Sequence, residues 1–209
     1  MPETPTLSID LTRMTMTKKF LRRLNRKRTI QILENVIEEV GQFYKSSPEA
    51  TQEFLSENDF QCLIYSKLRS RLYDGLENIL ACNVTLHTEV SFYEKAGLRL
   101  KFRPDLTLFF RKGIKWSDRD KFDWNFESEA VIAILEIKFI KSVNKKVLKE
   151  IQYDIDKLSE LQKTNSQQNR EPKVYLLCFS FAGAHQDKVQ RLASRHSKIA
   201  IKFFPSHLN

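Results

Sequence analysis

The stretch that decides the fold runs from Ala130 to Ile140 and reads AVIAILEIKFI. Its first six residues are all apolar, which is typical of a central strand buried on both faces of a sheet. Glu136 and Lys138 then stand two positions apart and therefore project from the same face of that strand. A buried carboxylate and a buried ammonium must pair, titrate or bind something, because leaving either unpaired is costly.

The segment upstream of this strand is predicted to form antiparallel strands. Apolar and polar residues alternate there with a period of two, as half-buried strands require. The predicted strands are Val84 to Phe92, Leu98 to Phe102 and Leu106 to Phe110. Lys95-Ala96-Gly97 supplies the turn of a hairpin, and Pro104-Asp105 interrupts its second arm. The polar segment 111–129 is predicted to be a long connection without regular structure.

Helical periodicity surrounds these strands. The predicted helices are a basic amphipathic helix around Phe20 to Leu24, a helix from Ile30 to Val40 that stops at Gly41, one capped by Ser56-Glu57-Asn58-Asp59 and continuing to Leu72, one from Val147 to Leu161, and a short one from His185 to Arg195. Further strands are expected at Val174 to Phe181 and, at a sheet edge, Ile199 to Phe204. This order predicts an α/β fold with a mixed central β-sheet flanked by helices. We expect residues 1–46 to form a basic N-terminal arm and helices, and residues 47–209 to form the domain.

Composition narrows the class of protein. The 209 residues are 41% hydrophobic with only 5 Gly, which excludes collagen-like and wholly disordered chains. No apolar run approaches the roughly 18 residues of a membrane span. The 3 Cys fit neither a paired disulfide framework nor zinc spacing, so we expect a reducing, cytoplasmic location. The 4 His are scattered, so any metal would be bound by oxygen.

Positive charge is concentrated near the N-terminus. The formal charge is +9 overall, and the segment through Ile30 holds eight basic and two acidic residues. Such an excess predicts a polyanionic partner: nucleic acid first, with an anionic membrane surface as a weaker alternative. A merely solvated helix face is the structural alternative. The candidate nucleic-acid-binding residues are Lys18, Lys19, Arg22, Arg23, Arg26, Lys27, Arg28 and, on the first core helix, Arg69.

Asp105 is the third member of the candidate site. It follows Pro104 where the hairpin strand is interrupted, so its carboxylate is expected at the same sheet edge as Glu136. Two carboxylates from adjacent strands suit Mg²⁺, which takes a few carboxylates plus waters and a substrate phosphate. Lys138 beside them would position or deprotonate an attacking water and stabilise charge that develops on the phosphate.

Pro104-Asp105 followed by Glu136-Ile137-Lys138 resembles the P-D…(D/E)-x-K signature of the restriction-endonuclease-like, or PD-(D/E)xK, nuclease superfamily. The predicted element order from Ser56 to about Phe181 is similar to the core of that family: helix, three-stranded meander, helix, strand (αβββαβ). The resemblance implies a Mg²⁺-dependent endonuclease, with Mn²⁺ as a possible substitute. It implies cleavage of phosphodiester bonds in nucleic acid, DNA in preference to RNA.

The resemblance also implies roles for individual residues. Asp105, Glu136 and the carbonyl of Ile137 would bind the metal, and Lys138 would assist catalysis. Many members carry a glutamate on the first core helix, for which Glu57 is the first candidate and Glu53 the second. Gln152 falls where some members place a site-supporting glutamine, although the aromatic residue that often follows it by four is Asp156 here.

Each candidate also has a purely structural interpretation. Glu136 and Lys138 could be a plain ion pair, Asp105 a turn residue that bonds its own backbone, and Glu57 a carboxylate that complements the helix dipole. At the level of function, the alternative is a catalytically inactive nuclease-like module for nucleic-acid binding or assembly. A homodimer is plausible for a nuclease, because cutting both strands of a duplex needs two sites.

Overall fold

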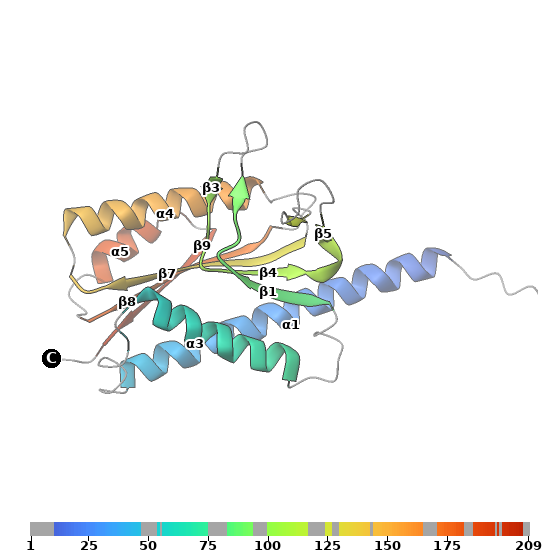
Figure 1. Cartoon of the computed structure of the whole chain (residues 1–209), viewed down its shortest axis with the longest axis horizontal. Coiled ribbons are helices and arrows are strands. Elements are labelled where there is room, and N and C mark those ends of the chain that lie inside the picture. The colour runs from blue at the N-terminus through green and yellow to red at the C-terminus, as the bar shows by residue number, and fades with distance from the viewer. Residues whose placement is uncertain are drawn as a thin grey trace, which may run out of the picture.

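The fold is built around a five-stranded sheet (Figure 1). The computed structural model describes residues 11–46, 54, 56–74, 83–93, 100–116, 124–126, 130–142, 144–164, 171–181, 186–194, 196 and 198–206, with side chains in the first helix from Asn25 onward. The strands lie in the order β1 (Val84–Thr88), β4 (Leu106–Phe110), β7 (Val131–Ile140), β8 (Lys173–Ser180) and β9 (Ile199–Pro205). Neighbours from β1 to β7 are antiparallel, and those from β7 to β9 are parallel. The predicted mixed sheet is confirmed.

Helices cover both faces of the sheet. In Figure 1, α1 (Leu11–Ser46) and α3 (Glu57–Arg69) lie on one face, and α4 (Lys145–Thr164) and α5 (Gln186–Ala193) lie on the other. A π-helical turn, Ser70–Asp74, continues α3. The order α3, β1, β4, β7, α4, β8 is the predicted core order, and β9 forms the expected edge strand.

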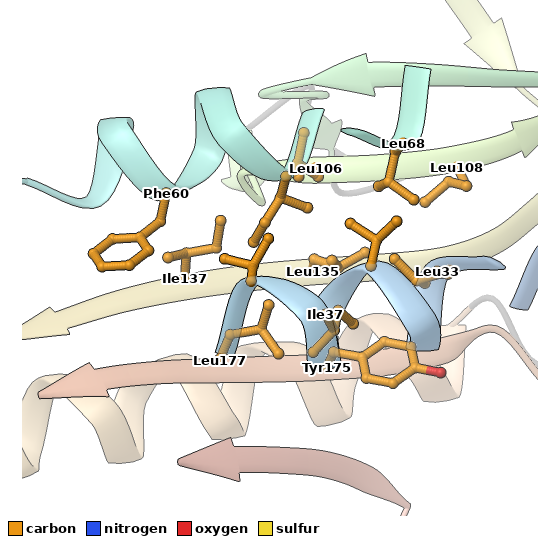
Figure 2. Close-up of a cluster of buried hydrophobic side chains, with 14 of the residues drawn as sticks. Leu33, Ile37, Phe60, Leu68, Leu106, Leu108, Leu135, Ile137, Tyr175 and Leu177 are labelled. Atoms are coloured by element: carbon orange, nitrogen blue, oxygen red, sulfur yellow. The ribbon is translucent and has the colours of Figure 1, made fainter. Parts of the chain in front are cut away.

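Strand β7 is the centre of the core. Leu135 and Ile137 are fully buried in a cluster with α1 and α3, which Figure 2 shows between the helices and the sheet. Ile134, on the opposite face, is buried in a second cluster with residues of α4 such as Ile155. Alternation along the strand therefore puts Glu136 and Lys138 on the face that α4 covers.

Helix α1 is one continuous element where the sequence predicted two. Its second half buries a stripe at helical spacing, made of Leu33, Val36, Ile37, Val40 and Tyr44. The predicted stop at Gly41 is wrong, because this glycine is needed for close packing and the helix runs on to Ser46. A Cβ at position 41 would lie 2.0 Å from the ring of Phe204, which itself stacks on Phe179.

The predicted hairpin is present but broken in both arms. Its first arm consists of β1 and β2 (Phe92–Tyr93), separated at Glu89, which adopts a positive φ of 49°. Its second arm consists of β3 (Leu100–Phe102) and β4, separated at Pro104-Asp105. The two breaks face each other, because the Glu89 N–H donates to the Asp105 carbonyl at 3.1 Å.

The segment 111–129, which the sequence predicted to lack regular structure, contains two short strands among its described residues. β5 (Ile114–Trp116) and β6 (Trp124–Phe126) pair in antiparallel fashion, with Ile114 opposite Phe126. The predicted turn at 95–97 and the second glutamate candidate, Glu53, lie outside the described residues. None of the helices within the described ranges combines the length and the apolar character that crossing a lipid bilayer requires.

We expect Gly41→Ala to destabilise the protein. Alanine is the better helix former by about 1 kcal/mol, but its Cβ would collide with the buried Phe204 ring, and such overpacking costs about 1–3 kcal/mol. Urea denaturation should show a net loss of unfolding free energy. The exposed neighbour substitution Gln42→Ala is the control and should change stability little. A Gly41→Ala protein more stable than wild type would contradict this packing.

Candidate active site

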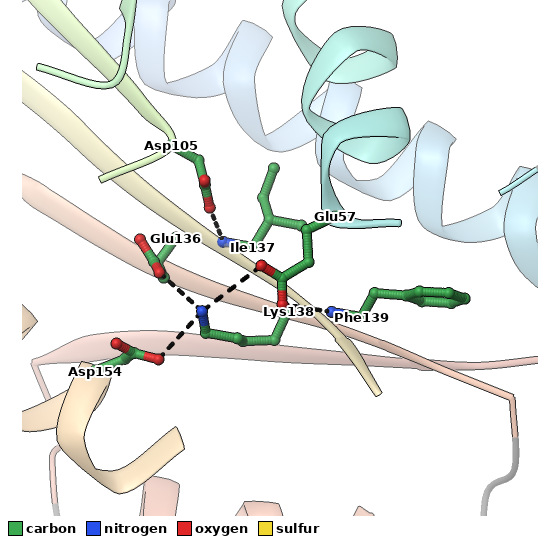
Figure 3. Close-up of polar contacts among 7 residues, drawn as sticks. All are labelled: Glu57, Asp105, Glu136, Ile137, Lys138, Phe139 and Asp154. Carbon is green, nitrogen blue, oxygen red and sulfur yellow. Dashed lines mark hydrogen bonds and ion pairs between the residues drawn. The ribbon is translucent and has the colours of Figure 1, made fainter. Parts of the chain in front are cut away.

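The candidate site is formed where β7 loses one of its two neighbours. Strand β4 begins at Leu106, opposite Leu135, whereas β7 runs on to Ile140 with β8 alone beside it. The main-chain N–H groups of Ile137 and Phe139 on the vacated edge take side-chain acceptors instead. Asp105 Oδ2 accepts from Ile137 N at 2.6 Å, and Glu57 Oε1 accepts from Phe139 N at 3.3 Å (Figure 3). Because β4 does not extend along this part of β7, the carboxylates of Asp105 and Glu57 occupy the hydrogen-bonding positions on the free edge of β7.

The backbone of Asp105 is fixed on both sides. Its carbonyl accepts hydrogen bonds from the Glu89 N–H at 3.1 Å and from Gln61 Nε2 of α3 at 2.8 Å. Gln61 is itself buried, whereas Glu89 lies in the exposed break between β1 and β2. Donors from two separate parts of the chain thus hold the backbone of Asp105, whose carboxylate reaches β7.

Lys138 lies at the centre of the cluster and faces three carboxylates from three elements. Its Nζ is 3.1 Å from Glu136 Oε1 on β7, 3.3 Å from Asp154 Oδ2 on α4 and 3.8 Å from Glu57 Oε2 on α3. Figure 3 shows these side chains converging on the ammonium. The structure therefore brings together Asp105, Glu136, Lys138 and Glu57, the four residues predicted as catalytic from the sequence.

Sequence reasoning missed Asp154. A signal was present: Asp154 occupies the buried stripe of α4 at helical spacing with Ile151, Ile155 and Leu158. An aspartate on an otherwise apolar stripe must have a partner inside the protein. This position in the apolar stripe is the signal that identifies Asp154 as a fifth member of the cluster.

Glu57 begins α3 but does not cap it. The N–H of Ser56 donates to Asp59 Oδ2 at 2.8 Å, so Asp59 supplies the capping carboxylate. The carboxylate of Glu57 instead reaches β7, where it contacts Phe139 N and Lys138. Its contacts are thus with the site, in addition to any effect on the helix dipole.

The site holds more negative than positive charge. Burial raises the pKa of Glu136 to about 8, with the nearby Asp105 adding to the effect and Lys138 opposing it. Burial also raises the pKa of Asp105 to about 6, against the Ile137 hydrogen bond. For Lys138, burial alone would lower the pKa, but Glu136, Asp154 and Glu57 outweigh it and the net shift is upward. Lys138 is therefore a firmly protonated cation in this arrangement.

The oxygen atoms of the site suit a small divalent cation that keeps several of its water ligands when it is bound. No three His, Cys, Asp or Glu side chains in the described part of the chain converge closely enough to form a metal cage. Mg²⁺ does not require one, since it binds through one or two carboxylates and keeps several waters. Glu136 Oε2 is buried without a hydrogen-bond partner, which is the kind of unsatisfied acceptor that a cation would complete. Asp105, Glu136 and the carbonyl of Ile137, on the same edge as its N–H, would hold the ion.

The remaining predicted residues lie elsewhere. Gln152 is on the opposite side of α4 from Asp154, where its amide donates to Asp156 Oδ1 at 2.8 Å. Arg26 donates to the carbonyls of Val131 and Ile132, both at 3.4 Å, near the start of β7. The structure does not bring Gln152 into the Lys138 cluster, and Arg26 already has main-chain partners.

The other basic candidates are surface groups where they are described. Lys27 and Arg28 on α1 and Arg69 on α3 are exposed. Lys18, Lys19, Arg22 and Arg23 belong to α1, but their side chains lie outside the described residues. In Figure 1 the amino-terminal part of α1 extends past the end of the sheet opposite to the one where β7 ends.

Comparisons with known proteins find distant similarity, and only among solved structures. No protein-family model matches the chain, and no curated protein matches its sequence. Among solved structures, P. aeruginosa ATCC27853 NucC in its cAAA-bound form is 13% identical with a TM-score of 0.39, over 72% of this chain and 62% of that one. E. coli MS115-1 NucC, also cAAA-bound, is 12% identical with a TM-score of 0.39, over 79% and 69%. The chain thus matches less than two thirds of the P. aeruginosa protein.

We expect Glu136→Gln to stabilise the protein in EDTA, increasingly so as the pH rises. A raised carboxyl pKa means that the folded state binds the proton more tightly, so wild-type stability is lost between the unfolded pKa of 4.5 and the folded value of about 8. Glutamine cannot ionise and escapes this loss. Urea denaturation should show a gain in unfolding free energy that is larger at pH 8 than at pH 5. The exposed Glu150→Gln is the control, and a gain that shrinks with rising pH would contradict the assignment.

Proposed function

We propose that this protein is a metal-dependent nuclease that hydrolyses phosphodiester bonds in DNA. The observation that supports this most is the meeting of Asp105, Glu136 and Lys138 at the unpaired edge of β7. Two acidic groups and one ammonium, brought together from β7 and from the break before β4, form a costly arrangement for stability alone. A reaction on a phosphate that also needs a cation would account for retaining it.

The residues divide the chemical work between them. Asp105, Glu136 and the Ile137 carbonyl would hold Mg²⁺, or Mn²⁺ in its place. The ion would supply Lewis-acid stabilisation of the phosphate and a more acidic bound water. Lys138, kept protonated by its carboxylate neighbours, would stabilise negative charge that develops on the phosphate. Glu57 would orient Lys138 from the α3 side.

Exposed lysines follow the end of β7 and occupy the start of α4. Lys141 follows β7 directly, and Lys145, Lys146 and Lys149 occupy the first turns of α4; all four are exposed. The first turn of α4 carries no acidic residue, so its positive dipole end adds to their charge. Asp154, a few turns further along the same helix, contacts Lys138. We infer that these lysines, at the end of β7 and the start of α4, hold the substrate backbone where it extends beyond the site.

The basic part of α1 would contact a different stretch of substrate. Arg26 marks the start of β7, and the six residues from Ile132 to Lys138 span about 20 Å. A duplex advances 3.4 Å per base pair, so this separation corresponds to roughly six base pairs. Lys27 and Arg28 would therefore reach only DNA that extends well beyond the cleavage point.

We expect cleavage that requires a divalent metal and the predicted residues. Wild-type protein with Mg²⁺ or Mn²⁺ should cut plasmid, linear, branched or single-stranded DNA, and Lys138→Ala and Asp105→Asn should each lower the rate by at least about 100-fold. EDTA should abolish cleavage. Lys163→Ala, an exposed lysine in the last turn of α4, is the matched control and should retain the wild-type rate.

The outcomes separate the possible functions. Equal cleavage by wild type and Lys138→Ala would mean a contaminant or a site elsewhere. Absence of cleavage by any protein, with salt-dependent binding retained in Asp105→Asn, would instead support a nuclease-like module that binds nucleic acid without cutting it. Cleavage of RNA in preference to DNA would correct the substrate.

Charge reversal should separate the two basic regions. The double variant Lys145→Glu/Lys149→Glu should weaken binding of both short and long duplexes by about tenfold and reduce the salt slope by about two. Lys27→Glu/Arg28→Glu should weaken binding of a 30-base-pair duplex but leave a 10-base-pair duplex unaffected. Fluorescence anisotropy at several salt concentrations measures both. An equal effect of the two variants on the short duplex would contradict the assignment of substrate to the α4 side.

A further inference from the structure

Lys138 and a bound cation would compete for the same carboxylate. The ammonium lies 3.1 Å from Glu136 Oε1, and Glu136 is a residue to which the proposed function assigns the metal. Two positive charges on one buried carboxylate repel strongly, because water screens them little. A divalent cation at the unpaired Oε2 of Glu136 therefore weakens the attraction between Glu136 and the ammonium at Oε1, and another carboxylate must then balance more of the lysine's charge.

Two other carboxylates are within reach, and they differ in their surroundings. Asp154 Oδ2 is 3.3 Å from the ammonium and its side chain is 12% exposed, whereas Glu57 Oε2 is 3.8 Å away and 42% exposed. Glu57 also accepts the Phe139 N–H with its other oxygen. Asp154 is thus the closer and less screened partner.

We propose that Asp154 is a positioning residue that receives Lys138 when a divalent cation occupies Glu136. Asp154 acts through the lysine and is not itself a ligand of the ion. It keeps the ammonium charged and close to the reacting phosphate, although Glu136 then attracts it less strongly. This inference rests on the proposed function, because it requires a cation at Glu136.

Metal binding in a double-mutant cycle tests the proposal. Mn²⁺ is titrated calorimetrically, without DNA, into wild type, Asp154→Asn, Lys138→Met and the double variant. Without Asp154 the lysine stays on Glu136, so Asp154→Asn should weaken Mn²⁺ binding by about tenfold in the wild-type background. In the Lys138→Met background no ammonium needs a new partner, so the same substitution should weaken binding by no more than about threefold.

Matched variants keep the interpretation specific. Asp156→Asn removes an equal charge two residues along α4, at an exposed position bonded to Gln152, and should leave Mn²⁺ affinity unchanged. Asp154→Glu restores a carboxylate and should recover part of the lost affinity. With DNA present, Asp154→Asn should lower kcat while KM for DNA stays near the wild-type value. Urea denaturation in EDTA confirms that each variant is folded.

Several results would overturn the proposal. An equal loss of affinity in both backgrounds would make Asp154 a ligand or a general source of negative potential. Unchanged Mn²⁺ binding by Asp154→Asn, with wild type binding the ion, would remove the positioning role and leave the proposed nuclease intact. A wild-type protein that does not bind Mn²⁺ would overturn both.

Discussion

The unequal lengths of two neighbouring strands control the architecture of the site. Because β4 starts at Leu106 while β7 continues to Ile140, two main-chain N–H groups of β7 face an empty position in the sheet. Unsatisfied buried N–H groups are expensive, so acidic side chains from the hairpin break and from α3 satisfy them. The same geometry that completes the sheet's hydrogen bonding therefore concentrates carboxylates around Lys138.

This concentration of buried charge lowers the stability of the fold, but it supplies groups that can take part in a reaction. Within the described residues, Lys138 is the ammonium that faces Glu136, Asp154 and Glu57, and the raised pKa values of Glu136 and Asp105 report the cost of burying the excess. Replacement of a buried ion pair by apolar residues of similar volume is often neutral or stabilising, so fold stability alone does not require this cluster. A site under such strain is most simply explained by a ligand that relieves it.

Hydrophobic periodicity and the strand motif predict most of the helices and strands and most of the residues in the candidate site. The apolar run that ends in Glu136 and Lys138 identifies β7, and Pro104-Asp105 identifies the break opposite it, because both are local patterns in the chain. Gly41 and Asp154 depend on contacts across the molecule. Gly41 is required by the ring of Phe204, which lies 163 positions away in the sequence. Asp154 is explained by its contact with Lys138 on β7. Local signals describe elements well, whereas packing between elements decides where a glycine or a buried aspartate is needed.

Helix α1 has a mechanical consequence. Its 36 residues form a rod of about 54 Å, of which the second half is anchored in the core and the first half projects beyond the sheet. A continuous helix that is anchored along one half holds its other half clear of the sheet. The length of α1 therefore separates its amino-terminal end from the end of β7 that carries the candidate site.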